Sequence, residues 1–294
     1  MQLTQCKIID QLINFIKSQE KQKIFSKFLE LLELKKSEII ERANTFAISG
    51  LLDQFMAYVV RKSKELQAHT DLQEFMLQLI NTLQQYKTRI EQAPSFIANK
   101  VLPLIKNGNT ILIFSFSHTI MKCIQQIVAS NIDFKLIVVQ SPVLNRDEKI
   151  QIGDQLQMLS NIGIRPFVVS EGGVTSIINT IDILLLGAEA MTQNCGLVNT
   201  IGTRQLAKLA FESKKTVIVA TQFFKFCKFF CFTDQEFYLK IGRQSTQYVE
   251  ESEYADYLQK YQDYTPPEWI TWVATEVGLY TSTQAADQAT LAFV

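Results

Sequence analysis

The sequence predicts an α/β protein in which an N-terminal helical domain, residues 1–106, precedes a parallel-sheet domain, residues 107–294. Two observations predict this fold. Apolar residues recur at three- and four-residue steps over the first hundred residues, and short apolar runs alternate with helix-like segments from residue 109 onward. The 294 residues are 47% hydrophobic, so the chain can bury a sizeable core.

The first domain is expected to contain amphipathic helices. Their apolar residues lie within residues 12–16, 24–32, 46–59 and 75–86, with Lys and Glu between them. Such stripes are typical of helices that pack on one another. Pro94 and Pro103 precede the change from helical to strand periodicity.

Five short apolar runs predict the strands of the second domain. Helix-like segments separate them, and this alternation is typical of a parallel, Rossmann-like sheet. The predicted strands are residues 110–116, 134–140, 164–170, 181–186 and 216–220.

A C-terminal helix is predicted from the segment Thr265-Pro266-Pro267-Glu268. It combines an N-cap residue, proline in the first turn and a glutamate three residues after the cap. We expect the helix to run through Trp269 and Trp272, with a structural role.

Composition excludes several classes of partner. The 29 basic and 29 acidic residues cancel, so no overall field attracts nucleic acid or an anionic membrane. The start of the chain lacks the pattern of a signal peptide, and no apolar run approaches the ~18 residues of a membrane helix. The five cysteines are an odd number without a disulfide pattern. We therefore expect a cytosolic protein with reduced thiols and no direct nucleic-acid or membrane partner.

The loop that follows the predicted strand 181–186 is the main candidate site. Gly187-Ala188-Glu189 comes directly after this strand, and ligands of parallel sheets bind at the carboxyl ends of the strands. Gly202 and Thr203 then precede a helical pattern. We expect the backbone N–H groups at this helix start to be unpaired, so that they could hold a phosphate or another anion.

The order of residues in this loop resembles a known family. The family pattern is roughly Gly-Ala-acid, then Asn-Gly, then Asn-Lys-x-Gly-Thr. It is shared by the regulatory subunits of translation initiation factor 2B and by the isomerases of methylthioribose-1-phosphate and ribose-1,5-bisphosphate. Three further segments agree in order, and they are Arg42-Ala43-Asn44, Phe224-Lys225-Phe226 and Tyr264-Thr265-Pro266-Pro267-Glu268-Trp269-Ile270-Thr271.

The resemblance implies that the catalytic pair of the isomerases is absent here. Those enzymes use a cysteine after the first strand and an aspartate in the later loop to move protons. This chain has Ser115-Phe116-Ser117-His118 at the first position and Glu189 at the second. Cys123 falls further along the next helix, and we interpret Cys195 as a substituted loop residue. We therefore predict no catalytic residues.

The sequence predicts no metal site or cofactor. His69 and His118 are the only histidines, and Cys227-x-x-x-Cys231 lacks further ligands. The surrounding aromatic run, residues 223–230, has two lysines, too few for a nucleic-acid site in a neutral chain. We expect it to be buried at a core edge or at a subunit interface.

The resemblance also implies a function. Glu189 and the chain length favour the alpha-subunit class of the family. Such subunits form a homodimer through the Rossmann-like half and bridge two copies of the beta, gamma, delta and epsilon assembly. The epsilon subunit exchanges guanine nucleotide on initiation factor 2. The alpha and delta subunits bind the phosphorylated alpha subunit of initiation factor 2, which lowers exchange under stress.

The resemblance and the chemistry of anion binding suggest contacts for a sugar phosphate. Thr200 replaces the lysine of the family pattern, so that contact is lost. For Arg42 and Lys225, surface or interdomain ion pairs are the alternative. The predicted ligand-binding residues are Arg42, Ser117, Glu189, Asn199, Gly202, Thr203 and Lys225.

Two alternative functions stay open at this point. The chain could be an active aldose-ketose isomerase that acts on a phosphorylated pentose. It could also be a free-standing, archaeal-type homologue with a metabolic-sensing role. Assays of isomerisation and of partner proteins distinguish the three.

Overall fold

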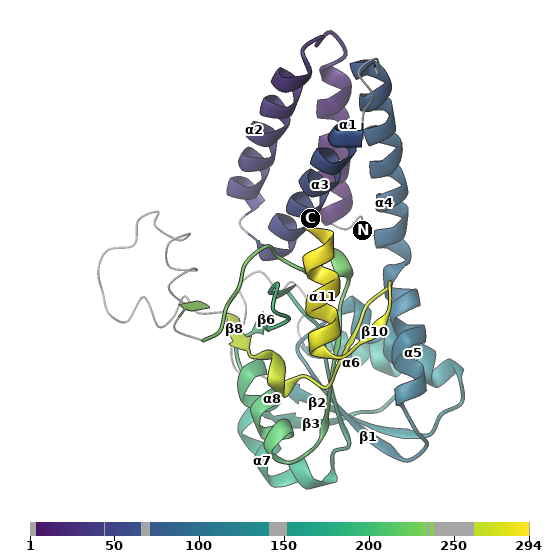
Figure 1. Cartoon of the computed structure of the whole chain (residues 1–294). Helices are drawn as coiled ribbons and strands as arrows, with labels where there is room; N and C mark the ends of the chain where they lie inside the picture. Colours follow the sequence, from purple (N-terminus) through teal and green to yellow (C-terminus); the bar gives the residue numbers. More distant parts are fainter. Residues whose placement is uncertain are drawn as a thin grey trace, which may run out of the picture.

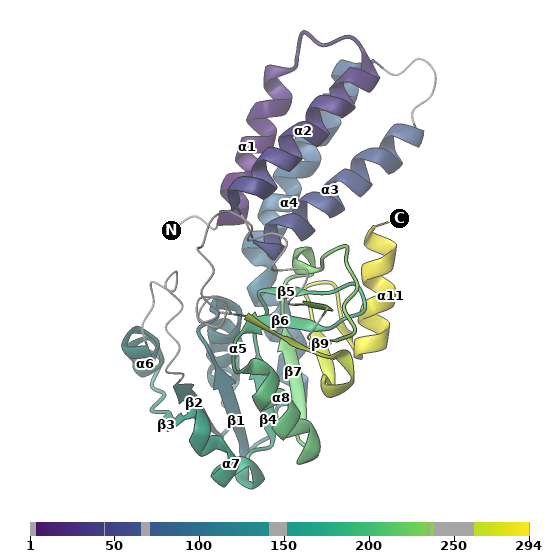
Figure 2. The same ribbon diagram turned by 90° about the vertical axis from the view of Figure 1, so that its left-hand side faces the viewer.

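Four long helices form the N-terminal domain, and they stand together at one end of the molecule (Figures 1 and 2). The computed structural model describes residues 4–43, 45–65, 71–140, 152–233, 236–237 and 262–293. The helices are α1 Thr4–Ser18, α2 Phe25–Ala43, α3 Phe46–Glu65 and α4 Leu72–Val101. Their apolar stripes meet in one core, as the helical periodicity predicts.

Helix α4 belongs to both halves of the molecule. Its apolar residues up to Ile90 lie in the core of the helical domain, whereas those from Ala93 onward pack in the second domain. Pro94 lies at this change of core and has no backbone N–H to donate within the helix. The boundary predicted at residue 106 falls after η1, Leu102–Leu104, and before the first strand. The change from one hydrophobic core to the other, at Ala93, therefore lies about 13 residues before the predicted domain boundary at residue 106.

The second domain is built on a seven-stranded sheet in the order β10-β9-β7-β4-β1-β2-β3. All neighbours pair in parallel except β9 and β10. The helical domain and this mostly parallel sheet confirm the predicted fold class. The strands are β1 Asn109–Phe114, β2 Phe134–Gln140, β3 Phe167–Ser170, β4 Ile183–Leu186, β7 Thr216–Ala220, β9 Trp272–Ala274 and β10 Leu279–Tyr280.

Helices cover both faces of the sheet, because alternate strand residues are buried on opposite sides. Ile111 and Ile113 pack with α4, with α5 (His118–Ala129) and with α6 (Ile152–Asn161). Leu112 and Phe114 lie in the core on the other face. The helices on that face are α7 Val174–Ile177, α8 Thr203–Glu212 and α11 Ser282–Ala292.

A second, three-stranded antiparallel sheet was not predicted. Its order is β5 Ala190–Met191, β6 Leu197–Thr200 and β8 Gln262–Thr265. The hairpin of β5 and β6 contains most of the predicted ligand loop. The pairing of β6 with β8 brings Asp263 opposite Asn199.

The predicted helix through Trp269 and Trp272 was wrong. Only one turn forms, η5 Pro267–Trp269, and Trp272 begins strand β9 beside β7. Thr271 N donates to Val217 O at 2.9 Å, so pairing with the open edge of the sheet outweighs the local capping pattern. The C-terminal helix is α11, which begins after Thr281 with a complete capping box.

Candidate functional site

The loops after β1 and β4 meet at the switch point of the sheet, where the strand order reverses. This is the usual ligand position in open α/β sheets. Gly187, directly after β4, permits this approach. A Cβ at Gly187 would lie 2.8 Å from Ser117 Oγ, so any side chain there would displace Ser117. Ser117 is the N-cap of α5 and accepts from Ile120 N at 3.4 Å.

Ser115 joins a third segment to these loops. Its φ is 62°, in the left-handed region that residues other than glycine rarely adopt. Ser115 Oγ lies 3.2 Å from Thr200 Oγ1 at the end of β6. The β1 loop, the β4 loop and the end of β6 therefore form one local structure.

Glu189 and Lys225 are brought together by the second sheet and by η4, Phe223–Lys225. Residues 187–189 form the acidic loop. Glu189 N donates to Val198 O at 3.0 Å, which fixes this loop on β6. Lys225 Nζ donates to Ala188 O at 2.5 Å. Burial lowers the pKa of Lys225, and the negative charge of Glu189 opposes this effect.

Asn199 and Thr203 are buried, and both side chains have partners within the chain. Asn199 Nδ2 donates to Thr203 Oγ1 at 3.0 Å, and Thr203 Oγ1 donates to Thr200 O at 2.6 Å. These bonds shape the turn that leads into α8.

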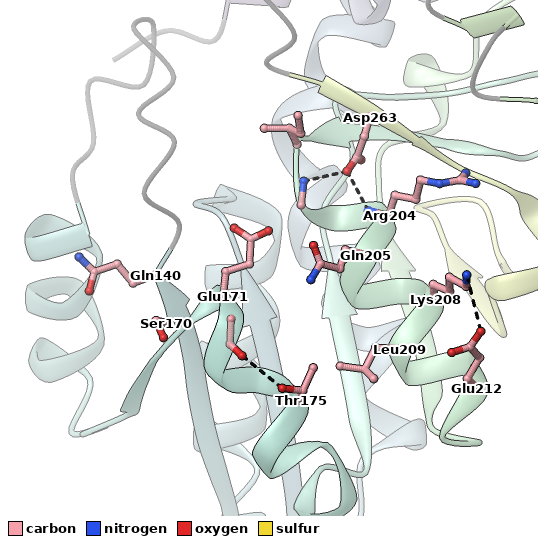
Figure 3. A pocket seen from close by; sticks show the side chains of 13 residues that line it. Gln140, Ser170, Glu171, Thr175, Arg204, Gln205, Lys208, Leu209, Glu212 and Asp263 are labelled. Carbon is pink, nitrogen blue, oxygen red and sulfur yellow. Dashed lines mark hydrogen bonds and ion pairs between the residues drawn. The ribbon is translucent and has the colours of Figure 1, made fainter. Parts of the chain in front are cut away.

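The start of α8 is occupied by a side chain of the protein itself. Asp263 Oδ2 accepts from Gly202 N at 2.8 Å and from Arg204 N at 2.9 Å (Figure 3). This carboxylate takes the position that favours an anion at the positive end of the helix dipole. The expectation that these N–H groups are unpaired is corrected accordingly. The predicted helix forms as α8, which begins at Thr203.

Arg42 is separate from the other predicted contacts in the described part of the chain. Its side chain lies in the last turn of α2, is 77% exposed, and pairs with Glu38 at 3.0 Å. This arrangement corresponds to the surface ion pair that was the alternative interpretation.

A cleft of about 1110 Å³ opens between β2, β3 and α8 (Figure 3). Of the predicted ligand residues, it contains only Gly202. Glu171 lies on one wall and Gln205 on the other. Sequence motifs did not indicate these residues, because their segments meet only through the sheet topology. The cleft is lined by Gln140, Ser170, Glu171, Gly172, Thr175, Ile201, Gly202, Arg204, Gln205, Lys208, Leu209, Glu212 and Asp263.

The cysteines nearest the predicted site are not arranged as nucleophiles. Burial raises the pKa of Cys123 and of Cys195 to about 12, so both are protonated near neutral pH. Cys195 lies in the hairpin between β5 and β6 with a φ of 68°. Cys227 Sγ donates to Phe46 O at 3.0 Å.

His118 is the first residue of α5 and is exposed. His69 lies outside the described residues. Within the described ranges, no three His, Cys, Asp or Glu side chains are grouped so that they could hold a metal ion. No helix in the described part of the chain is long and apolar enough to cross a membrane.

The fold and the site define a class of protein. It has a helical domain joined to a doubly wound α/β domain. An acidic side chain lies in the loop after β4, and Lys225 of η4 reaches this loop. Residues 3–282 match the profile of the Initiation factor 2 subunit family, and the chain belongs to this family.

Relatives of two kinds are similar to the chain. Translation initiation factor eIF2B subunit alpha from Dictyostelium discoideum is 29% identical over 83% of this chain and 77% of its own length. Ribose 1,5-bisphosphate isomerase from Methanocaldococcus jannaschii is 29% identical over 65% of this chain and 59% of its own length.

A solved structure shares the fold. The crystal structure of the tetrameric eIF2B-beta2-delta2 complex from C. thermophilum contains a chain that matches with a TM-score of 0.72 and 16% identity. The match covers 99% of this chain and 90% of that one.

Proposed function

We propose that the protein is a non-catalytic regulatory subunit of the translation initiation factor 2B complex. In this role it forms a homodimer that bridges two copies of the beta, gamma, delta and epsilon assembly. It senses the phosphorylated alpha subunit of initiation factor 2 and acts in the cytosol during the stress response. The similarity to an eIF2B alpha subunit over 83% of the chain supports this assignment.

The absence of a thiol from the β1 loop is the observation that carries the non-catalytic part of the proposal. Ser115, Phe116 and Ser117 follow β1, where the resemblance places the cysteine of the isomerases. Cys123 and Cys195 are buried, and their raised pKa disfavours the thiolate. The resemblance implies that the isomerases transfer protons with a cysteine and an acid together, and Glu189 alone does not supply this pair.

We also propose that a sugar phosphate binds near the switch point as a regulatory ligand. Lys225 supports this, because its buried ammonium interacts with the Ala188 carbonyl and the Glu189 charge. A phosphate would be a stronger partner than a carbonyl. Ser117 and Arg42 are further proposed contacts. Asn199, Gly202 and Thr203 would join them if the ligand displaces Asp263 from the start of α8.

An isomerase assay tests the non-catalytic assignment. Purified protein is incubated with ribose 1,5-bisphosphate or methylthioribose-1-phosphate, and the ketose product is measured. We expect no turnover above the uncatalysed rate. Turnover that Glu189→Gln abolishes would contradict the proposal and establish the isomerase alternative. Ser117→Cys is the matched variant, because it restores a thiol in the β1 loop.

A further inference from the structure

Three successive residues of one turn contact three different parts of the molecule. Phe224 is 2% exposed and lies in the core of the helical domain. Lys225 Nζ donates to Ala188 O in the acidic loop. Phe226 is fully buried in the core between the sheet and α8. The turn η4 and its next residue thus connect the acidic loop to both domains.

Helix α3 is fixed directly on this turn. Gln54 Nε2 donates to Phe223 O and to Phe226 O, both at 3.1 Å. Gly50 lets the helix approach, since a Cβ there would lie 2.5 Å from Phe226 O and 2.8 Å from Phe224 O. A displacement of the turn therefore requires a displacement of α3.

The opposite side of the turn is held by the segment between β9 and β10. The Glu276 carboxylate accepts from Phe223 N at 3.0 and 3.2 Å. The turn is therefore anchored at its start by Glu276 and at both ends by Gln54. Lys225 is the side chain within it that reaches the acidic loop.

The buried charge of Lys225 would be stabilised by a bound anion. Lys225 is partly exposed as a residue, but its ammonium is buried, with the Ala188 carbonyl as hydrogen-bond partner and Glu189 as the nearby negative charge. A phosphate group beside Lys225 would add negative charge where burial now penalises the ammonium. Such a ligand would strengthen the attachment of the turn.

We propose that the Phe224-Lys225-Phe226 turn couples ligand binding at the acidic loop to the order of α3 and the helical domain. An anionic ligand that engages Lys225 fixes the turn, and Phe224 and Gln54 transmit this to α3. The inference rests on the proposed sugar-phosphate site and describes how that site regulates the molecule.

A double-mutant cycle tests the coupling without any ligand. Gln54→Met removes the two hydrogen bonds at similar size, and Lys225→Met removes the ammonium. Among the described contacts, Gln54 bonds to the backbone of the turn and Lys225 belongs to the turn, so a non-additive effect of the two variants indicates coupling through it. We expect the shift in the denaturant midpoint of the double variant to differ from the sum of the single shifts.

Arg61→Met is the matched control, because Arg61 is an exposed residue of the same helix. The shift in denaturant midpoint caused by Arg61→Met should add to the shift caused by Lys225→Met. Additive shifts for Gln54 and Lys225 as well would overturn the coupling.

Hydrogen exchange with ribose 5-phosphate tests the response to a ligand, and ribose without phosphate is the control. We expect slower exchange in the loop of residues 187–189 and at least roughly fivefold slower exchange in residues 50–54 of α3. Lys225→Met should abolish the effect on α3. Protection of the loop without protection of α3 would overturn the coupling but leave the ligand site intact. No protection at either place would overturn the ligand site, and with it the ligand-driven coupling. The mutant cycle then shows whether the structural link itself exists.

Discussion

At the scale of single residues, Asp263 shows how the chain uses its own carboxylate in an anion position. Its two hydrogen bonds at the start of α8 are charge-assisted, and the helix dipole strengthens them. Arg204, on the same turn, donates to Tyr264 O and lies 4.8 Å from the centre of the Trp269 ring. The strand β8 thereby holds the turn that contains Asn199 and Thr203. A phosphate at this helix start would have to displace Asp263.

Asp263→Ala should lower the free energy of unfolding by about 1–3 kcal/mol, because one buried and one partly buried N–H group lose a charged acceptor. Asp263→Asn should have a smaller effect, since an oxygen acceptor remains. Denaturant unfolding measures both. Glu212→Gln is the control, because its pair with Lys208 is exposed and should contribute less than about 0.5 kcal/mol. Equal effects at residues 263 and 212 would contradict the role of Asp263.

Glu276 makes stability depend on pH. Burial raises its pKa above the ordinary 4.5, although the hydrogen bond from Phe223 N opposes the rise. The folded state therefore binds a proton at higher pH than the unfolded state, and this contribution is lost as pH rises from about 4.5 through the folded pKa. Glu276→Gln keeps an acceptor and lacks this titration. Its stability relative to the unmodified protein should increase between about pH 4.5 and 7.5. Denaturant midpoints that differ by a constant amount across this range would contradict the assignment.

Arg42 tests how far the ligand site extends. A ligand at about 100 times its Kd raises stability by about 2.7 kcal/mol, which shifts Tm upward. If Arg42 turns from Glu38 to the ligand, Arg42→Ala should remove most of the shift caused by a sugar phosphate. Arg61→Ala, at another exposed arginine, should retain it. An unchanged shift in Arg42→Ala would confine the site to the switch-point loops.

At the scale of elements, the hydrophobic periodicity of the sequence predicted the helices and strands that depend on local sequence alone. The strands 134–140 and 216–220 have the predicted bounds, because buried parallel strands are continuous apolar runs. The small sheet and β9 were missed, since they depend on pairing between distant segments. Asp263 was missed for the same reason. The acidic loop was recognised by its residue order, yet the sequence did not reveal that Lys225 contacts Ala188.

Gly50 tests the contact between α3 and η4. Gly50→Ala should lower the free energy of unfolding by about 1–3 kcal/mol, because its methyl group would meet the backbone of Phe224 and Phe226. Gly153→Ala is the control, since Gly153 lies in α6 with nothing near the added Cβ, and alanine favours a helix. Circular dichroism during denaturant unfolding measures both. A similar effect of the two variants would contradict the prediction, because it would show that α3 and η4 move apart to accept the methyl group.

At the scale of the whole molecule, the family and the fold connect the chain to two kinds of protein. Its relatives include an eIF2B subunit and an isomerase at the same 29% identity, but the match to the eIF2B subunit covers 83% of this chain and the match to the isomerase 65%. The β1 loop without a thiol favours the subunit. Contacts of η4 join the helical domain to the acidic loop within one chain.

The central claim is that the protein works as part of an initiation factor 2B assembly. The most direct measurement is affinity purification of the tagged protein from its own cells, followed by mass spectrometry of the proteins recovered in near-equal amounts. We predict four partners with the sequences of the beta, gamma, delta and epsilon subunits. Recovery of the protein alone, as a homodimer, would contradict the claim.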